Sequence, residues 1–373
     1  MTQPDARGTA IASVRAYSLH VPLRKTLADA LYVRTHWNIP VVEITTADGI
    51  VGTGYSGVWA GEDLIVSTIR DHLTESLIGR DSTRISRIWD DIYWSPLHWV
   101  GRAGVAHMAL GMVDTALWDI AAQRAGLPLW KLLGGRHDTL ETYNTDGGWL
   151  NFSIDELLED MGGMVDAGWA RVKMKIGGPD PDVDLDRVRR VRDALPSGVT
   201  MMVDANQNWD FITARRYAPR LADLGIAWLE EPLHPDDVTG HARLARLGAI
   251  PIALGENVYA EEGFTSFFEA AAVDFVQVDV TRVAGITEWL RIAASAQSRS
   301  LTVAPHAGDM MQVHQHLVAG VGSAKTPMIE YLPWGLEVFE SPVAMTGSSI
   351  RLPDAPGAST AISSEARRRW EAK

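Results

Sequence analysis

Three carboxylic acids follow successive short apolar runs in the second half of the chain, namely Asp204, Glu230 and Glu256. An acid after a buried strand is often the N-cap of the next helix, and for one such acid that is the simpler interpretation. If the three runs are neighbouring strands, the acids share one volume and repel one another unless a cation holds them together. A site made only of carboxylate oxygens favours Mg²⁺, with Mn²⁺ as an alternative, over Zn²⁺.

Two lysines, Lys173 and Lys175, end an earlier apolar run and are two residues apart. In a strand this spacing puts both side chains on the same face. The ordinary explanation is an edge strand with one wet face, because Arg171 continues the alternation. A closed barrel has no such edge. There, two ammonium groups beside a dication would lower each other's pKa, so that one lysine serves as a neutral base near pH 7.

Asp279 and His306 end two further runs, which lie opposite the lysines if the runs form a barrel. A carboxylate beside an imidazole fixes its tautomer and raises its basicity. A lone histidine after a proline would more often be a surface or capping residue, and the paired acid is what favours a catalytic function. His314 and His316 fall in the helical pattern that follows, where we expect ordinary solvated or packed side chains.

The elements that could bring these groups together form a repeated pattern from residue 140 onward. Short apolar runs alternate with longer helical stretches, which is typical of βα units. Eight such runs end near Tyr143, Lys175, Asp204, Glu230, Glu256, Asp279, His306 and Glu330. Eight parallel strands in series predict a (β/α)8-type barrel, an α/β fold whose catalytic groups lie at the carboxyl ends of the strands.

The first part of the chain has a different pattern. It predicts an antiparallel meander and two helices, over residues 11–19, 41–46, 50–54, 64–77 and 104–124. Residues 24–38 fit neither template, and because such polar loops often cover active sites we interpret this segment as a lid. We therefore expect three parts: an α+β capping domain at 1–135, the barrel at 136–337, and a segment at 338–373 that packs back on the capping domain.

The composition limits the partners of the protein. Of 373 residues, 46% are hydrophobic and 22% are charged, as in globular proteins with a large core. The formal net charge of −13 disfavours nucleic acid and anionic membranes, which leaves a small molecule as the expected partner. The absence of cysteine excludes disulfide and thiolate chemistry, and the polar first residues lack the apolar core of a signal peptide. We expect a cytoplasmic homo-oligomer.

In combination these motifs resemble the mandelate racemase subgroup of the enolase superfamily, over nearly the whole chain. The resemblance is carried by Lys173-Met-Lys175, Val203-Asp204-Ala-Asn206, Trp228-Leu-Glu230-Glu231-Pro232, Gly255-Glu256-Asn257, Asp279 with Val283-Ala284-Gly285, and Pro305-His306. Ala284 stands where relatives often have a second glycine, which puts no role in doubt. The resemblance implies a modified (β/α)7β barrel with an N-terminal α+β capping domain.

The resemblance also implies a role for each matching residue. These are metal ligands at Asp204, Glu230 and Glu256, a base at Lys175, Lys173 and Glu330 on the substrate carboxylate, a substrate contact at Asn206, and the Asp279–His306 dyad on the opposite face. Enzymes of this superfamily use a Lys or His base with Mg²⁺ and form an ene-diolate. The expected partial reaction is therefore abstraction of the α-proton of a hydroxylated carboxylate.

Among the outcomes of that reaction, we favour dehydration of an acid sugar, an aldonate or aldarate, to a 2-keto-3-deoxy acid. The lid offers Lys25, Tyr32 and Arg34, and the barrel offers Tyr143, as substrate contacts. Racemisation or lactone cycloisomerisation is the alternative, because the same Lys/His pair serves both outcomes. A carboxylate-binding regulatory protein would not need two opposed bases, and a Schiff-base aldolase would not need a metal site.

Overall fold

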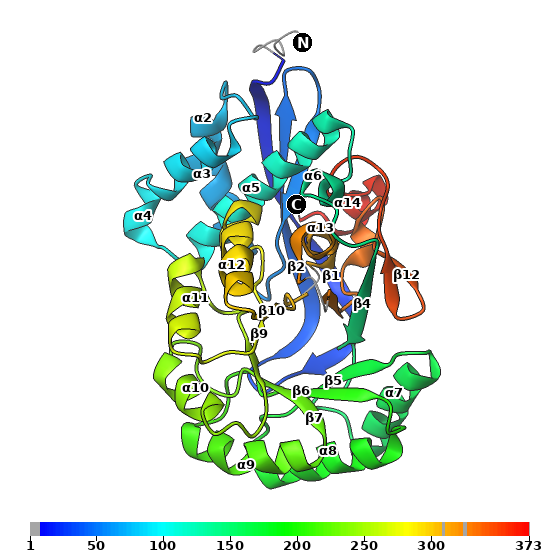
Figure 1. Cartoon of the computed structure of the whole chain (residues 1–373). Coiled ribbons are helices and arrows are strands. Elements are labelled where there is room, and N and C mark those ends of the chain that lie inside the picture. The colour runs from blue at the N-terminus through cyan, green and yellow to red at the C-terminus, as the bar shows by residue number, and fades with distance from the viewer. Residues whose placement is uncertain (1–7, 308–309, 324–326, 373) are drawn as a thin grey trace.

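The computed structural model describes residues 8–307, 310–323 and 327–372, in two lobes (Figure 1). The first lobe is built on an antiparallel sheet of β1 (Ile11–Ala28), β2 (Val33–Thr46) and β3 (Val51–Tyr55). Its helices are α1 (Glu62–Ser67), the π-helical turn η1 (Thr68–Leu73), α2 (Thr74–Leu77), α3 (Ile85–Tyr93), α4 (Leu97–Val100), α5 (Val105–Ala125) and α6 (Leu129–Leu132). The predicted meander is confirmed.

Helix α5 packs directly on β2 and β3, and two glycines make the close approach possible. A Cβ atom at Gly54 would lie 1.9 Å from the carbonyl oxygen of Met112, and one at Gly52 would lie 2.1 Å from that of Ala116. Both positions therefore require glycine. The helix ends where Gly126 adopts a left-handed φ of 67°, which confirms the boundary predicted from the sequence.

Residues 24–38 are mostly strand, and the prediction of an irregular loop is wrong. β1 continues to Ala28 and β2 begins at Val33, with a register shift in their pairing between Pro22 and Leu27. This irregularity interrupts the alternation of polar and apolar residues, so the two-residue period of a strand is lost from the sequence. In Figure 1 the long blue strands run from the N-terminal end of the molecule to the labelled barrel strands.

The second lobe is the predicted barrel of eight parallel strands joined by seven helices. Its strands are β4 (Thr139–Asn144), β5 (Arg171–Lys175), β6 (Thr200–Asp204), β7 (Ile226–Glu230), β8 (Ile252–Leu254), β9 (Phe275–Val276), β10 (Thr302–Val303) and β11 (Met328–Tyr331). Consecutive strands pair in parallel from β4 to β10, and β11 returns to pair with β4. The connecting helices are α7 (Ile154–Asp166), α8 (Pro181–Ala194), α9 (Phe211–Asp223), α10 (Val238–Ala245), α11 (Ala260–Glu269), α12 (Ile286–Ser298) and α13 (Met311–Val321).

The last part of the chain contacts both lobes, not only the capping domain. After η2 (Leu336–Val338), the hairpin of β12 (Ala344–Thr346) and β13 (Ser349–Arg351) extends the barrel sheet, because β13 pairs antiparallel with β4. Helix α14 (Ser364–Trp370) packs on β1 of the first lobe. There the Ala372 N–H donates to the Ser18 carbonyl at 2.9 Å.

One hydrophobic core joins the barrel to the hairpin of β1 and β2. Leu27, Trp37 and Ile39 of the hairpin belong to the same buried cluster as the barrel residues Met174 and Val203. The hairpin is therefore fixed on the barrel by apolar burial. None of the described helices is long and apolar enough to span a membrane.

Candidate active site

Asp204, Glu230 and Glu256 meet at the carboxyl ends of three neighbouring strands. Asp204 and Glu230 are the last residues of β6 and β7, are register partners, and are fully buried. Glu256 follows β8 by two residues, and one oxygen from each acid lies within 4.8 Å of the other two. Gly255 has a φ of 148°, and a Cβ there would lie 2.8 Å from the backbone of Gln277, so glycine is required where the chain turns into the site.

The electrostatics of this triad favour a bound cation. Burial raises the pKa of Glu230 to about 8, and the charges of Asp204 and Glu330 add to the effect, although Lys173 opposes it. Carboxylates this close and this buried are costly unless positive charge compensates them. An all-carboxylate oxygen set of this kind fits Mg²⁺ or Mn²⁺.

Lys173 and Lys175 project from β5 toward the triad, as their spacing predicts. Lys173 Nζ lies 2.5 Å from Glu230 Oε1, and Lys175 Nζ lies 2.5 Å from Asp204 Oδ2. Burial lowers the pKa of Lys175, but the Asp204 carboxylate outweighs it and the net shift is upward. The lowered lysine pKa predicted beside a bound dication stays a prediction, because here each ammonium group has a carboxylate partner that raises its pKa.

Asp279 and His306 form the predicted dyad just beyond the ends of β9 and β10. His306 Nδ1 lies 2.9 Å from Asp279 Oδ2, and His306 Nε2 lies 3.4 Å from Glu256 Oε2. Burial lowers the pKa of His306, but the charge of Glu256 and the hydrogen bond with Asp279 raise it overall to about 10. The Thr281 N–H and hydroxyl both donate to Asp279 Oδ1, which holds this carboxylate in place.

The two candidate bases therefore stand at opposite ends of the triad. Lys175 contacts Asp204 at one end, and His306 contacts Glu256 at the other. Both side chains line one cavity of about 60 Å³. A ligand in this cavity would lie close to both candidate bases.

Glu330 and Asn206 also line this cavity. Glu330 Oε1 lies 2.7 Å from Lys173 Nζ, and Glu330 Oε2 accepts from the Ala307 N–H at 2.8 Å. Burial raises the pKa of Glu330, but Lys173 and His306 lower it overall to about 2, so this group is ionised and can only accept hydrogen bonds. Asn206 has a left-handed φ of 41°, and its side-chain oxygen is buried without a partner among the described residues.

A second layer of polar residues supports the triad. Glu231 accepts from Gln207 Nε2 at 2.8 Å and from Asn257 Nδ2 at 3.1 Å. Asn257 also donates to Glu256 Oε1 at 3.1 Å, which links this layer to the triad. Burial, together with the charge of Glu256, raises the pKa of Glu231 well above its usual value. Glu231 thus supports the triad through Asn257, which bonds to both Glu231 and Glu256.

Three residues predicted to contact substrate lie away from the cavity. Tyr143 is fully buried beneath it, with its ring 5.6 Å from Lys173 Nζ and 5.1 Å from the ring of Trp228. Lys25 pairs with Asp160 on the surface, and Tyr32 is 56% exposed at the hairpin turn. None of these three residues lines the cavity, so their contacts with substrate stay predictions. Arg34 does line the cavity.

The remaining walls of the cavity were not expected from the sequence. Four tryptophans line it, from β2, the loop after β3, the loop after β4 and the loop after β11: Trp37, Trp59, Trp149 and Trp334. Their rings contact one another, with centroid distances from 4.0 to 5.6 Å. The cavity is therefore more aromatic than predicted. Arg282, which follows β9, is a further cationic lining residue that the sequence analysis missed.

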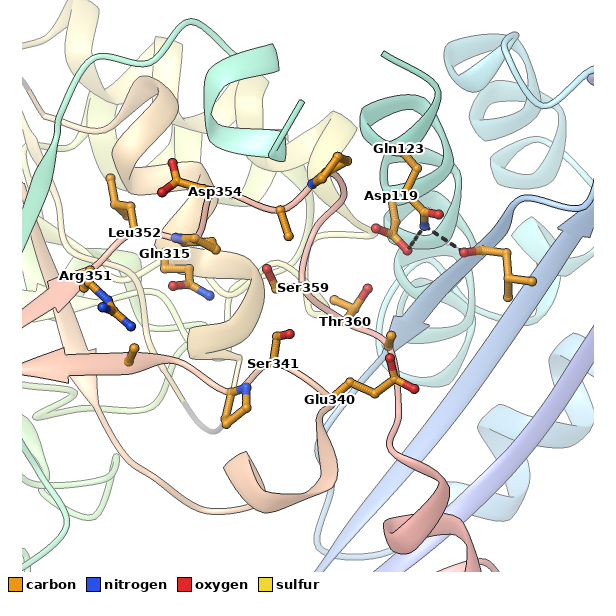
Figure 2. Close-up of a pocket in the computed structure, with 17 residues that line it drawn as sticks. Asp119, Gln123, Gln315, Glu340, Ser341, Arg351, Leu352, Asp354, Ser359 and Thr360 are labelled. Atoms are coloured by element: carbon orange, nitrogen blue, oxygen red, sulfur yellow. Dashed lines mark hydrogen bonds between the residues drawn. The ribbon is translucent and has the colours of Figure 1, made fainter. Parts of the chain in front are cut away.

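A larger cavity of about 650 Å³ lies elsewhere, between α5, α13 and the C-terminal segment (Figure 2). Gln123 Nε2 donates to Asp119 Oδ2 at 2.9 Å and to the Val51 carbonyl at 2.7 Å. Figure 2 shows Gln123 beside Asp119 at one side of this cavity. Asp119 also accepts from the Thr53 and Ala358 N–H groups. This cavity contains none of the triad, lysine or dyad residues, so the smaller cavity is the candidate active site.

Comparison with known proteins agrees with this fold and site. Residues 12–134 match the N-terminal domain of mandelate racemase and muconate lactonizing enzyme, and residues 156–366 match the enolase C-terminal domain-like family. The chain therefore belongs to the mandelate racemase and muconate lactonizing enzyme family, and the resemblance noted in the sequence is confirmed.

Individual relatives in this family include dehydratases and a cycloisomerase. The chain is 34% identical to L-talarate/galactarate dehydratase of Salmonella typhimurium, across 97% of this chain and 91% of that protein. It is 32% identical to 3,6-anhydro-alpha-L-galactonate cycloisomerase of Streptomyces coelicolor, across 93% and 95%. A crystal structure of the Salmonella dehydratase with Mg and L-lyxarohydroxamate superposes with a TM-score of 0.92, across 100% of this chain and 96% of the other.

Proposed function

We propose that this protein is a Mg²⁺-dependent acid sugar dehydratase. The observation that carries the proposal is the placement of Lys175 and His306 at opposite ends of a carboxylate triad, within one cavity. Similarity to L-talarate/galactarate dehydratase supports dehydration as the outcome. The proposed substrate class is a hydroxylated carboxylate, either an aldonate or an aldarate.

Asp204, Glu230 and Glu256 would hold the Mg²⁺, since their oxygens converge within 4.8 Å. When bound, the cation supplies positive charge that offsets these carboxylates and stabilises the negative charge which a substrate carboxylate acquires on losing its α-proton.

Lys173 would bind the substrate carboxylate. Its side chain is only 1% exposed. Burial lowers its pKa, while Glu230 and Glu330 raise it well above the usual value, so it stays charged. A fixed ammonium group stabilises the ene-diolate more than the substrate, because the second negative charge develops there. Glu330 and the Tyr143 ring hold Lys173 in place.

Lys175 would take the α-proton, and His306 would give a proton to the departing β-hydroxyl. A general acid must be protonated before the reaction, and the hydrogen bond with Asp279, which raises the pKa of His306, favours that state. The Asp279 carboxylate accepts a hydrogen bond from the Nδ1–H group, which leaves the Nε2 proton for the leaving group. His306 thus completes the loss of water that Lys175 begins.

A panel of acid sugars with Mg²⁺ tests this proposal, with detection of 2-keto products. We expect a 2-keto-3-deoxy acid from at least one acid sugar, and none with the Lys175→Ala variant. Cycloisomerisation is the second candidate, because one relative catalyses it. Exchange of the α-proton for deuterium, with an isomer as product and no loss of water, would replace the first proposal by the second.

A cytoplasmic location and a homo-oligomeric assembly remain predictions. Cell fractionation tests the first, and light scattering after size-exclusion chromatography tests the second.

A further inference from the structure

Arg34 enters the candidate active site from the hairpin, and its guanidinium group is held rigidly. Its side chain is only 8% exposed and forms an ion pair with Asp29 through Nη1. Asp29 is itself fixed, because its Oδ1 accepts from the N–H groups of Leu31 and Tyr32 at 2.8 Å each. The guanidinium carbon also lies 3.9 Å from the centre of the Trp59 ring.

This arrangement leaves one edge of the guanidinium group of Arg34 unused. Asp29 takes Nη1, whereas Nε is buried and has no hydrogen-bond partner among the described residues. The Nε–Nη2 edge of an arginine is a two-donor fork that matches the two oxygens of a carboxylate. A buried donor without a partner is unfavourable, so this edge is prepared for a ligand.

The substrate carboxylate next to the reacting carbon is not the ligand expected at the free Nε–Nη2 edge of Arg34. That carboxylate is assigned to Lys173 and the triad, which lie at the ends of the barrel strands, whereas Arg34 comes from the opposing hairpin. The cavity thus has cationic groups on two separate walls. If the far end of the substrate were a neutral hydroxyl group, Asp29 alone would compensate the charge of Arg34, which lies among aromatic side chains.

We propose that the substrate is a dicarboxylic acid sugar, an aldarate, whose second carboxylate binds the free Nε–Nη2 edge of Arg34. The aromatic rings of Trp37, Trp59 and Trp334 exclude water from this contact and strengthen it. This inference rests on the proposed function and narrows it to one substrate class. Arg282, whose Nη1 is also buried without a partner among the described residues, is the competing receptor.

Matched substrate pairs test the inference. We would measure kcat/KM for six-carbon aldarates and for aldonates of the same configuration, which differ only at C6. The wild-type protein should prefer the aldarate by about 100-fold, as expected when a buried charge loses its partner. Arg34→Met should lower kcat/KM for the aldarate by a similar factor and change the aldonate value less than threefold. Arg34→Lys should restore part of the preference.

Arg24→Met is the control, because it removes the same charge from an exposed position on the same hairpin. It should leave both values unchanged. Equal kcat/KM for aldarates and aldonates in the wild-type protein would overturn the inference. An equal loss on both substrates in Arg34→Met would do the same, because it would show that Arg34 only supports the hairpin. Loss of the preference in Arg282→Met alone would overturn the assignment to Arg34.

A binding measurement separates this inference from the proposed function. Calorimetry on the Mg²⁺-loaded Lys175→Ala variant should detect aldarate binding that weakens about 100-fold on adding Arg34→Met, with aldonate binding little changed. If no acid sugar is dehydrated but this selectivity is found, the proposed function fails while the second carboxylate site stands. If aldonates and aldarates bind equally well, the inference fails even when dehydration is observed.

Discussion

At the scale of single residues, Lys175 and His306, the two groups proposed to transfer protons, have different surroundings. Among the described residues, Lys175 forms an ion pair with Asp204, whereas His306 lies between Asp279 and Glu256. The imidazole is thereby kept protonated, which suits an acid. The pKa of Lys175 depends on the charge of the Asp204 carboxylate, which a bound cation would offset. This suits a base that is activated only when the metal is bound.

We predict that Lys175→Ala and His306→Asn each lower turnover of the acid sugar by at least ~10²-fold, the usual contribution of a positioned acid or base. Turnover assays and circular dichroism would check this, and the fold should remain intact. One of the two variants should still exchange the α-proton in deuterated water. Wild-type rates in both variants would disprove the assignment of these residues.

His316 is a buried histidine that belongs to the structure rather than to catalysis. Its Nδ1 accepts from the Trp130 N–H at 3.2 Å, so the remaining proton is on Nε2, which lies 3.2 Å from Ser359 Oγ. Burial lowers the pKa of His316 to about 3, from 6.5 in the unfolded chain. In this pH range the unfolded state binds a proton that the native state does not bind. The free energy of unfolding therefore falls as the pH drops from 6.5 toward 3.

We predict that His316→Gln reduces the slope of the free energy of unfolding against pH by up to about 1.4 kcal/mol per pH unit between pH 6.5 and 4.5. Glutamine keeps an acceptor for the Trp130 N–H but does not titrate. Urea unfolding at several pH values would measure the slope. The exposed His36→Gln variant should behave like the wild-type protein, and an unchanged slope in His316→Gln would exclude the histidine as the cause.

At the scale of elements, Asp119 joins three segments that are distant in the sequence. Its carboxylate on α5 accepts from the Thr53 N–H of β3 at 3.0 Å and from the Ala358 N–H at 2.6 Å. Burial raises its pKa to about 6, against the effect of these hydrogen bonds. The cluster in Figure 2 thus ties the capping sheet to the C-terminal segment.

We predict that Asp119→Ala lowers the free energy of unfolding by about 3 kcal/mol, because it leaves buried N–H groups without partners. Turnover per folded molecule should be unchanged, since Asp119 does not line the active cavity. Asp354→Ala, at a fully accessible position beside the same cavity, should be neutral. Chemical denaturation of the two variants would compare them, and equal stabilities would contradict the proposed linking function.

The barrel could be predicted at the element scale, because each strand end carries an ionisable side chain that a buried strand would not otherwise hold. The same reasoning located the triad, both lysines and the dyad. The hairpin could not be predicted, because the register shift after Pro22 hides its two-residue period. The aromatic walls of the cavity could not be predicted either. Trp37 and Trp334 are distant in the sequence and become neighbours only when the two lobes pack together.

At the scale of the whole molecule, metal binding should add to stability. A ligand that binds only the folded state stabilises it by mass action, by about 2.7 kcal/mol at one hundred times its Kd. We predict that Mg²⁺ raises the melting temperature of the wild-type protein and leaves that of Glu230→Gln unchanged. Scanning calorimetry and metal analysis would check this. The exposed Glu75→Gln variant should respond like the wild type, and full activity in excess EDTA with no bound metal would refute the metal assignment.

The return of the C-terminal segment to β1 has a consequence for how the chain reaches its native state. Arg15 and Glu371 form a hydrogen bond across a sequence separation of 356 residues, and Leu19 forms a bridge with Glu371. The sheet of the first lobe is therefore completed only by residues that leave the ribosome after the entire barrel. Such long-range contacts slow folding, because the entropy of closing the loop is lost before the contacts form. The capping lobe should consequently mature after synthesis of the barrel, and the two lobes should unfold together in one cooperative transition.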